Sequence, residues 1–448
     1  MIVLIDQTEP SLVLQRDRRK AVRIGVGQGV TEVDPLRIAR AATHDGRAVL
    51  FQRFDNATRH LTKTMIVFAS ELIEEPTFEE SLRRALVEAG DAPIFAFAGN
   101  EALIGEQAPG PASFPNHVVL QLTTYLEIDH SAGESTLVTR DEEEQALKDL
   151  SSILVRATSS CAPLPTSEQA SWEQAPDFAE YCRRLEMIRM AAAHGDIDGA
   201  VLSIGMSRPT LADPFDIYRG LVRANPSPFG FVLCIGDRAL TGSSPLAFMS
   251  VRGDRIRLET DAGTRPVTGD PVLDAEAAAD LLVNPKDAAE HQVVVDEERD
   301  SLQRIATDGR IAVSIDKEVR RFSHVMHLYT VFEASLAEGH DLADAVLALA
   351  PAAAVSGRPK RKAARLGVEL EGAPRGPYGG ILGVIEPDVG RADLAVVIRS
   401  LWLSNGRAYL RVGGKITADS NAESEYQECL SKSRFLVEGV IAAESRVD

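Results

Sequence analysis

The sequence predicts a soluble protein of mixed α and β structure, with a core large enough for one large domain or several smaller ones. The chain has 448 residues, of which 44% are hydrophobic and 25% charged, close to the average for globular proteins. Short apolar runs of strand length alternate along it with longer segments of helical periodicity. These observations exclude a wholly disordered chain, a collagen-like repeat and a coiled coil.

The charge balance argues against nucleic acid as a partner. Lys and Arg total 48 against 66 Asp and Glu, a formal net charge of -18, which would repel a phosphate backbone. A small anionic substrate is compatible with this charge only where local cations, backbone amides or a bound metal ion offset it.

Cysteine usage and hydropathy favour a cytoplasmic protein. The four cysteines are scattered without a CxxC pair, so neither a zinc knuckle nor a disulfide framework is indicated. No apolar run approaches the roughly 20 residues of a membrane helix, and the first ten residues lack the pattern of an export signal. We therefore expect no contact with a membrane.

The first part of the chain, residues 1–163, reads as a β-rich lobe. Strand-like runs occur at 48–51, 65–68, 94–97 and 117–122, separated by turns. Residues 164–177 are rich in turn-forming residues and lack periodicity, which predicts a linker. Apolar residues at helical spacing then predict a helix over 178–193, which Gly195 ends.

The remaining region, residues 178–448, alternates between the two kinds of element. Strands are predicted at 200–204, 230–235, 392–400 and 408–412, and amphipathic helices at 214–224, 326–338 and 424–443. The alanine-rich stretch 345–355 is predicted to be helical. No internal repeat of 20 to 50 residues is visible.

Two pairs of carboxylates stand at helical spacing. Asp287 and Glu290 lie three residues apart in KDAAEH, as do Glu425 and Glu428 in ESEYQE, so each pair shares one face of a helix. If the two faces meet, their oxygen atoms suit a hard divalent cation, Mg²⁺ above all, which would in turn accept an anionic substrate. The alternative is a pair of solvated acidic surfaces.

Glycine-dense segments with a neighbouring cation form the second pattern. Glycine lets backbone amides approach a ligand, and the cation attracts a carboxylate or phosphate; the alternative is a turn with a surface cation. His324 and His327, one helical turn apart if that segment is a helix, lack a third metal ligand nearby. The segments are AGTRP (262–266), VSGRPK (355–360), RGPYGG (375–380) and RVGGK (411–415).

Taken in order, these segments resemble the chorismate-utilising enzymes, and anthranilate synthase component I most of all. The resemblance runs from about 178 to 446 and includes DPFDIYRGLVRANPSPFGFVL, HVMHL and RVGGKITADSNAESEYQECLSKS. It implies an α+β fold of two packed antiparallel sheets with outer helices, and it identifies residues 178–448 as the chorismate-binding catalytic region.

The resemblance also assigns roles to individual residues. Glu290 and Glu428 match the principal Mg²⁺ ligands, with Asp287 and Glu425 as their companions. His327 matches the histidine beside the substrate ring. The positions implied in substrate binding are Arg399, Tyr378, Gly413, Gly414, Lys432 and Thr264.

Several positions depart from the family pattern, and they fall on the chemistry. Leu246 replaces the glutamate proposed as general acid for the departing ring hydroxyl, and Gly199 replaces the Gln or Lys beside the incoming nucleophile. Glu259 is the nearest substitute acid by sequence. Lys415 replaces a glycine, and we expect it to enter the pocket as a new acid or base. Further departures are Ile204, Ala354, Asp300, Ser301 and Asp287.

Two functions follow from the resemblance and its departures. The first is a Mg²⁺-dependent lyase or aminating synthase acting on chorismate or a close relative, with ammonia or water as nucleophile. The second is a regulatory or ligand-binding homologue that has lost turnover, because Leu246 and Gly199 remove both sides of the usual acid–base arrangement. The expected partners are the small anionic substrate, a separate glutaminase subunit and a second copy of the chain.

Overall fold

Two antiparallel sheets form the centre of the molecule. The computed structural model describes residues 21–26, 30–43, 46–55, 57–106, 114–158, 170–322 and 325–445, and every strand pairing within them is antiparallel. The first sheet runs through β6 (Glu134–Thr139), β5 (His117–Asp129), β3 (Leu61–Leu72), β2 (Arg47–Phe54), β9 (Phe229–Ile235), β10 (Arg238–Ser244), β18 (Ser400–Ser404), β19 (Arg407–Ile416) and β8 (Gly199–Pro209), with β1 (Val22–Val26) beside β6, and β7 (Glu173–Ala175) and β15 (Gly357–Arg358) beside β8.

The second sheet branches from β5, which pairs with both β3 and β4. It runs through β4 (Ile94–Ala98), β16 (Ile381–Glu386), β17 (Arg391–Val396), β11 (Ala247–Arg252), β12 (Arg255–Pro266), β14 (Val325–Ser335) and β13 (Ala312–Arg321).

The sheets pack face to face over an aromatic core. Phe51 and Phe231 of the first sheet belong to the same buried cluster as Phe95, Phe97 and Leu382 of the second. Phe51 and Phe95 meet edge to face, with ring centroids 6.4 Å apart, an arrangement that aromatic pairs favour. Large alternating apolar side chains on both inner faces therefore hold the sandwich together.

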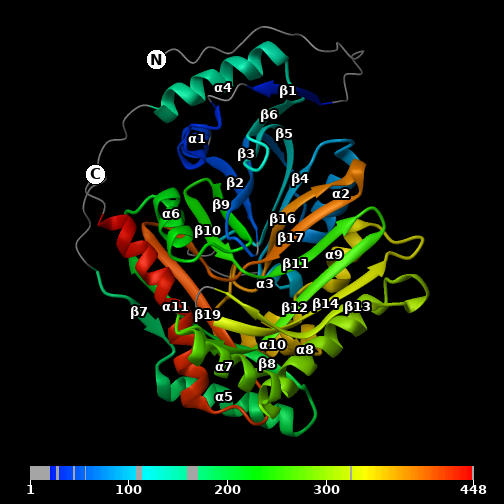
Figure 1. Ribbon diagram of the computed structural model, residues 1–448, viewed down its shortest axis with the longest axis vertical. Helices are drawn as coiled ribbons and strands as arrows, with labels where there is room; N and C mark the ends of the chain where they lie inside the picture. The colour runs from blue at the N-terminus through cyan, green and yellow to red at the C-terminus, as the bar shows by residue number, and fades with distance from the viewer. Residues whose placement is uncertain are drawn as a thin grey trace.

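Helices cover the outer faces of both sheets (Figure 1). In that view α1 and α4 lie at the same end as β1, whereas α5, α7 and α10 lie at the opposite end. The helices are α1 (Pro35–Ala42), α2 (Phe78–Glu88), α3 (Asn100–Ile104), α4 (Glu143–Thr158), α5 (Phe178–Ala193), α6 (Pro214–Ala224), α7 (Pro271–Val283), α8 (Pro285–Gln303), α9 (Leu342–Leu349), α10 (Lys360–Glu371) and α11 (Ala422–Glu444), with 3-10 turns at Thr307–Gly309, Ala353–Val355 and Pro387–Val389.

Local sequence fixes the start of the two helices that carry the acidic pairs. Asn284 caps α8 by accepting hydrogen bonds from the backbone N–H groups of Lys286 and Asp287, and Pro285 occupies the first helical position. Asn421 caps α11 in the same way through the N–H of Ser424. Each acidic pair therefore lies near the start of a helix, and its three-residue spacing places both members on one face of that helix, as predicted.

Most predicted elements are confirmed, one is wrong, and two are longer than the elements observed. In the stretch 345–355, predicted to be helical, α9 ends at Leu349 because Pro351 cannot continue it, and only a 3-10 turn follows at Ala353–Val355. The strand predicted over 392–400 ends at Val396.

The α+β class with two packed antiparallel sheets is confirmed, as are the helices at 178–193 and 214–224. The helix predicted over 326–338 is instead the strand β14, hydrogen-bonded on both sides to β12 and β13. Since both of its faces carry buried side chains, apolar residues occur at consecutive positions and mimic helical spacing.

Strands of the expected N-terminal lobe pair directly with strands of the C-terminal region. β2 is hydrogen-bonded to β9, and β4 to β16. The division at 163 stays a prediction, and Cys161, linker residues 164–169 and His324 lie outside the described residues. Among the described residues, no helix combines the length and apolar character needed to cross a membrane.

Candidate functional site

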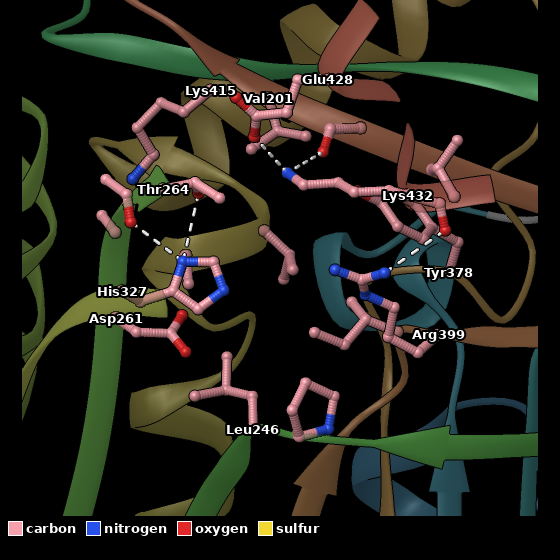
Figure 2. A pocket seen from close by; sticks show the side chains of 18 of the residues that line it. Val201, Leu246, Asp261, Thr264, His327, Tyr378, Arg399, Lys415, Glu428 and Lys432 are labelled. Carbon is pink, nitrogen blue, oxygen red and sulfur yellow. Dashed lines mark hydrogen bonds and ion pairs between the residues drawn. The ribbon is translucent and has the colours of Figure 1, made fainter. Parts of the chain in front are cut away.

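A cavity opens where the ends of β12, β14 and β19 meet helices α8 and α11. Figure 2 shows charged side chains converging on it from opposite sides. Its lining consists of Val201, Pro245, Leu246, Asp261, Ala262, Gly263, Thr264, Glu290, His327, Ala354, Val355, Tyr378, Ile398, Arg399, Arg411, Val412, Gly413, Lys415, Glu428 and Lys432.

Two of the four predicted metal-binding carboxylates reach the cavity. Glu290 of α8 and Glu428 of α11 line it, so the two helix faces meet as the metal prediction requires. Asp287 is outside the lining and lies 2.7 Å from Arg265. Glu425 is outside it as well, 2.9 Å from Lys286, an ion pair that ties α11 to α8.

The two cavity carboxylates differ in charge. Burial opposes ionisation of Glu428, but the ammonium of Lys432, 2.6 Å away, outweighs it and lowers the pKa of Glu428. Burial, together with the charge of Glu428, raises the pKa of Glu290 to about 7. Within the described residues Glu290 forms no hydrogen bond or ion pair. Its half-buried carboxylate therefore faces the cavity without a protein partner in the described residues and could accept a bound cation.

Glu290 and Glu428 are the two residues of the predicted set that could hold a metal ion in this cavity. Among the described residues, no group of three or more His, Cys, Asp or Glu side chains is gathered closely enough to hold a metal ion. Mg²⁺ in substrate sites is commonly held by one or two carboxylates, with waters and substrate oxygens as its other ligands. Of the four carboxylates only Glu290 and Glu428 line the cavity, and Glu428 is paired with Lys432 just as Asp287 is with Arg265 and Glu425 with Lys286.

Two cations, Arg399 and Lys432, line the cavity together with the carboxylates. Arg399 lies between β17 and β18 with φ 51°, a left-handed conformation uncommon for a side-chain-bearing residue, and its guanidinium stacks over Phe435 at 5.4 Å. Lys432 donates to the carbonyl oxygen of Gly413 at 2.9 Å. Held in this way, Arg399 and Lys432 present two cations to one ligand.

The segment 413–415 lies in β19, where it lines the cavity. A Cβ atom on Gly413 would come within 2.6 Å of the Tyr378 hydroxyl, so only glycine fits beside that ring. Tyr378 is itself buried, which raises its pKa to about 12 and keeps the hydroxyl protonated. Gly414 does not line the cavity; a Cβ there would lie 3.2 Å from Glu425 Oε2.

Lys415 extends into the cavity. Only 6% of its surface is exposed, and Nζ donates to the carbonyl oxygen of Ala353 at 3.2 Å. Burial lowers the pKa of Lys415 to about 8, although the carboxylate of Glu290 opposes the shift. The side chain is therefore placed inside the pocket, where a ligand anion could contact it.

His327 lies on β14 opposite Thr264 of β12. Its Nδ1 is 2.9 Å from the carbonyl oxygen of Gly263 and 3.1 Å from Thr264 Oγ1. Because a carbonyl oxygen only accepts, Nδ1 carries the proton and Nε2 is left as the acceptor. Burial lowers the pKa of His327 while Asp261 raises it, and the net direction is down. The imidazole is thus neutral at neutral pH.

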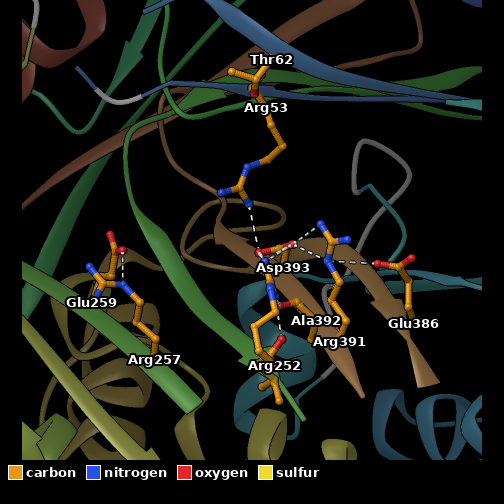
Figure 3. Close-up of polar contacts among 10 residues, drawn as sticks. Arg53, Thr62, Arg252, Arg257, Glu259, Glu386, Arg391, Ala392 and Asp393 are labelled. Carbon is orange, nitrogen blue, oxygen red and sulfur yellow. Dashed lines mark hydrogen bonds and ion pairs between the residues drawn. The ribbon is translucent and has the colours of Figure 1, made fainter. Parts of the chain in front are cut away.

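The sequence prediction that Glu259 supplies the missing acid is not supported by its position. Glu259 lies on β12 outside the cavity, 3.2 Å from Arg257 (Figure 3). It also lies 3.2 Å from Arg320. The acid that reaches the cavity from this strand is Asp261, two residues further along. Sequence reasoning missed it, although it directly precedes the AGTRP segment that was singled out.

Gly199 does not line the cavity. A Cβ at this position would lie 2.9 Å from the carbonyl oxygen of Ile416 on the neighbouring strand β19, so the two strands lie too close here to accommodate a side chain. Val201, two residues further along β8, reaches the cavity instead.

A separate polar cluster lies around the end of β2 (Figure 3). The guanidinium of Arg53 stacks 4.1 Å over Phe229 and lies 3.3 Å from Asp393, which also pairs with Arg252 at 2.9 Å. This cluster ties β2 and β9 of the first sheet to β17 and β11 of the second, and none of its members lines the cavity described above.

Comparison with known proteins gives a consistent result. Residues 43–438 match the family model described as chorismate binding enzyme. Anthranilate synthase component 1 of Streptomyces coelicolor is 34% identical over 353 residues, covering 75% of this chain and 69% of that protein. The corresponding protein of Thermus thermophilus is 38% identical over 264 residues, 58% of this chain and 57% of its own.

Solved structures extend the similarity to the whole fold. Anthranilate synthase component I from Streptococcus pneumoniae superposes with a TM-score of 0.71 at 25% identity, covering 97% of this chain and 95% of that one. The menaquinone-specific isochorismate synthase of Escherichia coli gives a TM-score of 0.75 at 21% identity, with 94% of each chain covered, and this likeness concerns the fold alone.

Proposed function

The chain belongs to the family of chorismate-binding enzymes, and from this premise we propose that it is a Mg²⁺-dependent lyase or aminating synthase acting on chorismate or a close relative. The observation that carries the proposal is the polarity of the cavity. Glu290 reaches it from α8, the paired Glu428 and Lys432 from α11, and Arg399 from the loop between β17 and β18. A substrate with two carboxylates could use the cations directly for one of them and a metal ion for the other.

Glu290 and Glu428 would hold the metal ion. When bound, Mg²⁺ would supply positive charge that neutralises a substrate carboxylate. The ionised Glu428 is prepared for this role by Lys432, and Glu290 has no competing partner in the described residues. The binding of an anionic substrate is thereby compatible with a chain whose net charge is -18.

Several residues would orient the substrate. The guanidinium of Arg399 suits a carboxylate, because its planar donors can bind two oxygens at once. Tyr378 would donate a neutral hydrogen bond beside Gly413. His327 offers Nε2 as an acceptor to a ring hydroxyl, and Lys415 adds a cation that the family's glycine does not provide.

The nucleophile would be ammonia or water. The relatives are named component 1, which suggests a second component, and a separate glutaminase subunit is the partner that would supply ammonia. With Gly199 closed against Ile416, the chain provides no side chain at that position to orient the nucleophile. Ordinary anthranilate formation is therefore not the expected principal reaction.

The experiment is incubation of the protein with chorismate, with and without Mg²⁺ and ammonium, followed by mass-resolved product analysis. The expected result is a product that forms only with Mg²⁺. Water that replaces the departing ring hydroxyl gives an isomer of chorismate with the same mass, which incorporation of isotopically labelled oxygen from the solvent would identify, whereas a product that gains nitrogen would identify ammonia.

A second function, ligand binding without turnover, is favoured by one observation. Leu246 occupies the place of the expected acid and cannot donate a proton. Mg²⁺-dependent binding of chorismate that returns the substrate unchanged would establish this alternative.

A further inference from the structure

The cavity lacks an acid at Leu246, the residue directly before β11, but has one on the neighbouring strand β12. The pairing of β11 with β12 ends at Met249 and Leu258, next to an irregularity of β11 at Ala247. Leu246 lies three residues before Met249 and Asp261 three residues after Leu258, so both leave this pairing toward the cavity. Both residues line the cavity, and Figure 2 shows the carboxylate of Asp261 between His327 and Leu246.

Asp261 is not used by the fold. Among the described residues it has no hydrogen-bond or ion-pair partner, and it is only partly buried. This distinguishes it from Asp287, Glu425 and Glu428, each of which binds a cation within 3 Å. A carboxylate that faces a cavity without a partner is available to a ligand.

The neighbours of Asp261 at this wall supply no other carboxyl group. Leu246 has no titratable group, and the Nδ1 proton of His327 is committed to the carbonyl oxygen of Gly263. Lys415 donates to the carbonyl oxygen of Ala353 and offers its other donors as an anion-binding cation, and Glu259 lies beside Arg257 outside the cavity. The only carboxyl group that reaches this wall in the described residues is therefore that of Asp261.

We propose that Asp261 is the acid–base catalyst of this site, in place of the acid lost at Leu246. The inference rests on the proposed chorismate chemistry and names the group that would perform its proton transfer. The acid would then come from β12 rather than from the residue that leads into β11, at the same wall of the cavity.

The nucleophile forms a bond to a ring carbon, the ring double bond shifts, and the bond from the ring to its hydroxyl oxygen breaks with the electron pair on oxygen. Asp261 gives its proton to that oxygen, which leaves as water, and becomes a carboxylate. The proton that ammonia or water loses after addition then restores the acid, directly or through solvent.

The test compares Asp261→Asn with the unaltered protein in two assays, conversion of chorismate and Mg²⁺-dependent binding of chorismate by calorimetry. Asn keeps the size of the side chain but cannot transfer the proton. We expect conversion to fall by about 10²- to 10⁴-fold while the dissociation constant changes by less than about threefold. Glu333→Gln is the matched control, because Glu333 lies on the adjacent strand β14, pairs with Arg257 and does not line the cavity.

A double variant, Asp261→Asn with Leu246→Glu, tests whether the two positions are equivalent. The double variant should convert chorismate at least about tenfold faster than Asp261→Asn, since the glutamate introduced in place of Leu246 again supplies an acid to the cavity. Asp261→Asn that converts chorismate as fast as the unaltered protein would overturn the inference and leave the proposed function standing. An unaltered protein that binds chorismate without converting it would refute the proposed lyase function, and the role of Asp261 with it. A folded double variant that recovers nothing would also contradict the inference.

Discussion

The ammonium of Lys432 lies 2.6 Å from the carboxylate of Glu428, one turn earlier on α11, and 2.9 Å from the carbonyl oxygen of Gly413. One cation and one carboxylate of the cavity are thus paired on the same helix. It keeps Glu428 ionised, whereas Glu290 on α8 has no such partner in the described residues and its pKa is raised to about 7. The two carboxylates expected to hold the metal ion are therefore unequal before any ligand arrives.

Lys415→Met should weaken the binding of chorismate by about tenfold or more, because a charge-assisted contact contributes about 1.5 to 3 kcal/mol and Met keeps most of the apolar stem. Calorimetry measures the affinity, and product analysis detects a change in the reaction. Lys362→Met is the matched control, since 57% of the Lys362 side chain is exposed far from the cavity lining. A Lys415→Met protein with the affinity and product of the unaltered chain would show that Lys415 makes no contact with the ligand.

His327 should titrate below its ordinary value of 6.5, because burial lowers its pKa. The neutral ring is favoured in the folded state, so its contribution to stability is present above pH 6.5 and is lost as the pH falls through the folded pKa. Since Asp261 raises this pKa, Asp261→Asn should lower it further. A pH titration followed by NMR of labelled histidine, assigned with His327→Gln, measures both shifts. An increase in Asp261→Asn would contradict the placement of the two groups.

Gly199→Ala should destabilise the fold by about 1 to 3 kcal/mol, the usual cost of forcing extra atoms into a packed site. The added Cβ would lie 2.9 Å from the carbonyl oxygen of Ile416, and backbone cannot move aside cheaply. Urea unfolding measures the free energy. On the same strand, Gly205→Ala is the control, because its Cβ would meet its nearest neighbour at 3.8 Å. Equal stabilities would show that β8 and β19 can separate without cost.

Much of the fold could be predicted from local sequence, and the error is instructive. The helices at 178–193 and 214–224 show one apolar face and clear caps, signals that lie within the element itself. The strand β14 was predicted to be a helix because it is covered on both faces by other elements, which removes the alternation that identifies a half-buried strand. That covering depends on residues far away in the chain and is not visible locally.

The candidate site likewise has residues that local sequence predicts and residues that it does not. Helical spacing and family resemblance together located Glu290 and Glu428, because each acidic pair belongs to a single helix. The spacing of the acidic residues could not show that Arg265 forms an ion pair with Asp287, because the arginine lies on β12, a different element. Asp261 was missed for a similar reason: its relation to Leu246 depends on the register of two strands, whereas Glu259 was preferred only for its nearness in sequence.

The most direct test of the account is calorimetric titration of chorismate into the protein with and without Mg²⁺, repeated with Glu428→Gln. Glu438→Gln, an exposed position on the same helix, is the control. If Glu428 holds a Mg²⁺ ion that binds the substrate, chorismate should bind tightly only when both Mg²⁺ and Glu428 are present, because this carboxylate is the ionised one of the two that face the cavity. Binding that is equally strong without Mg²⁺, or in Glu428→Gln, would contradict it.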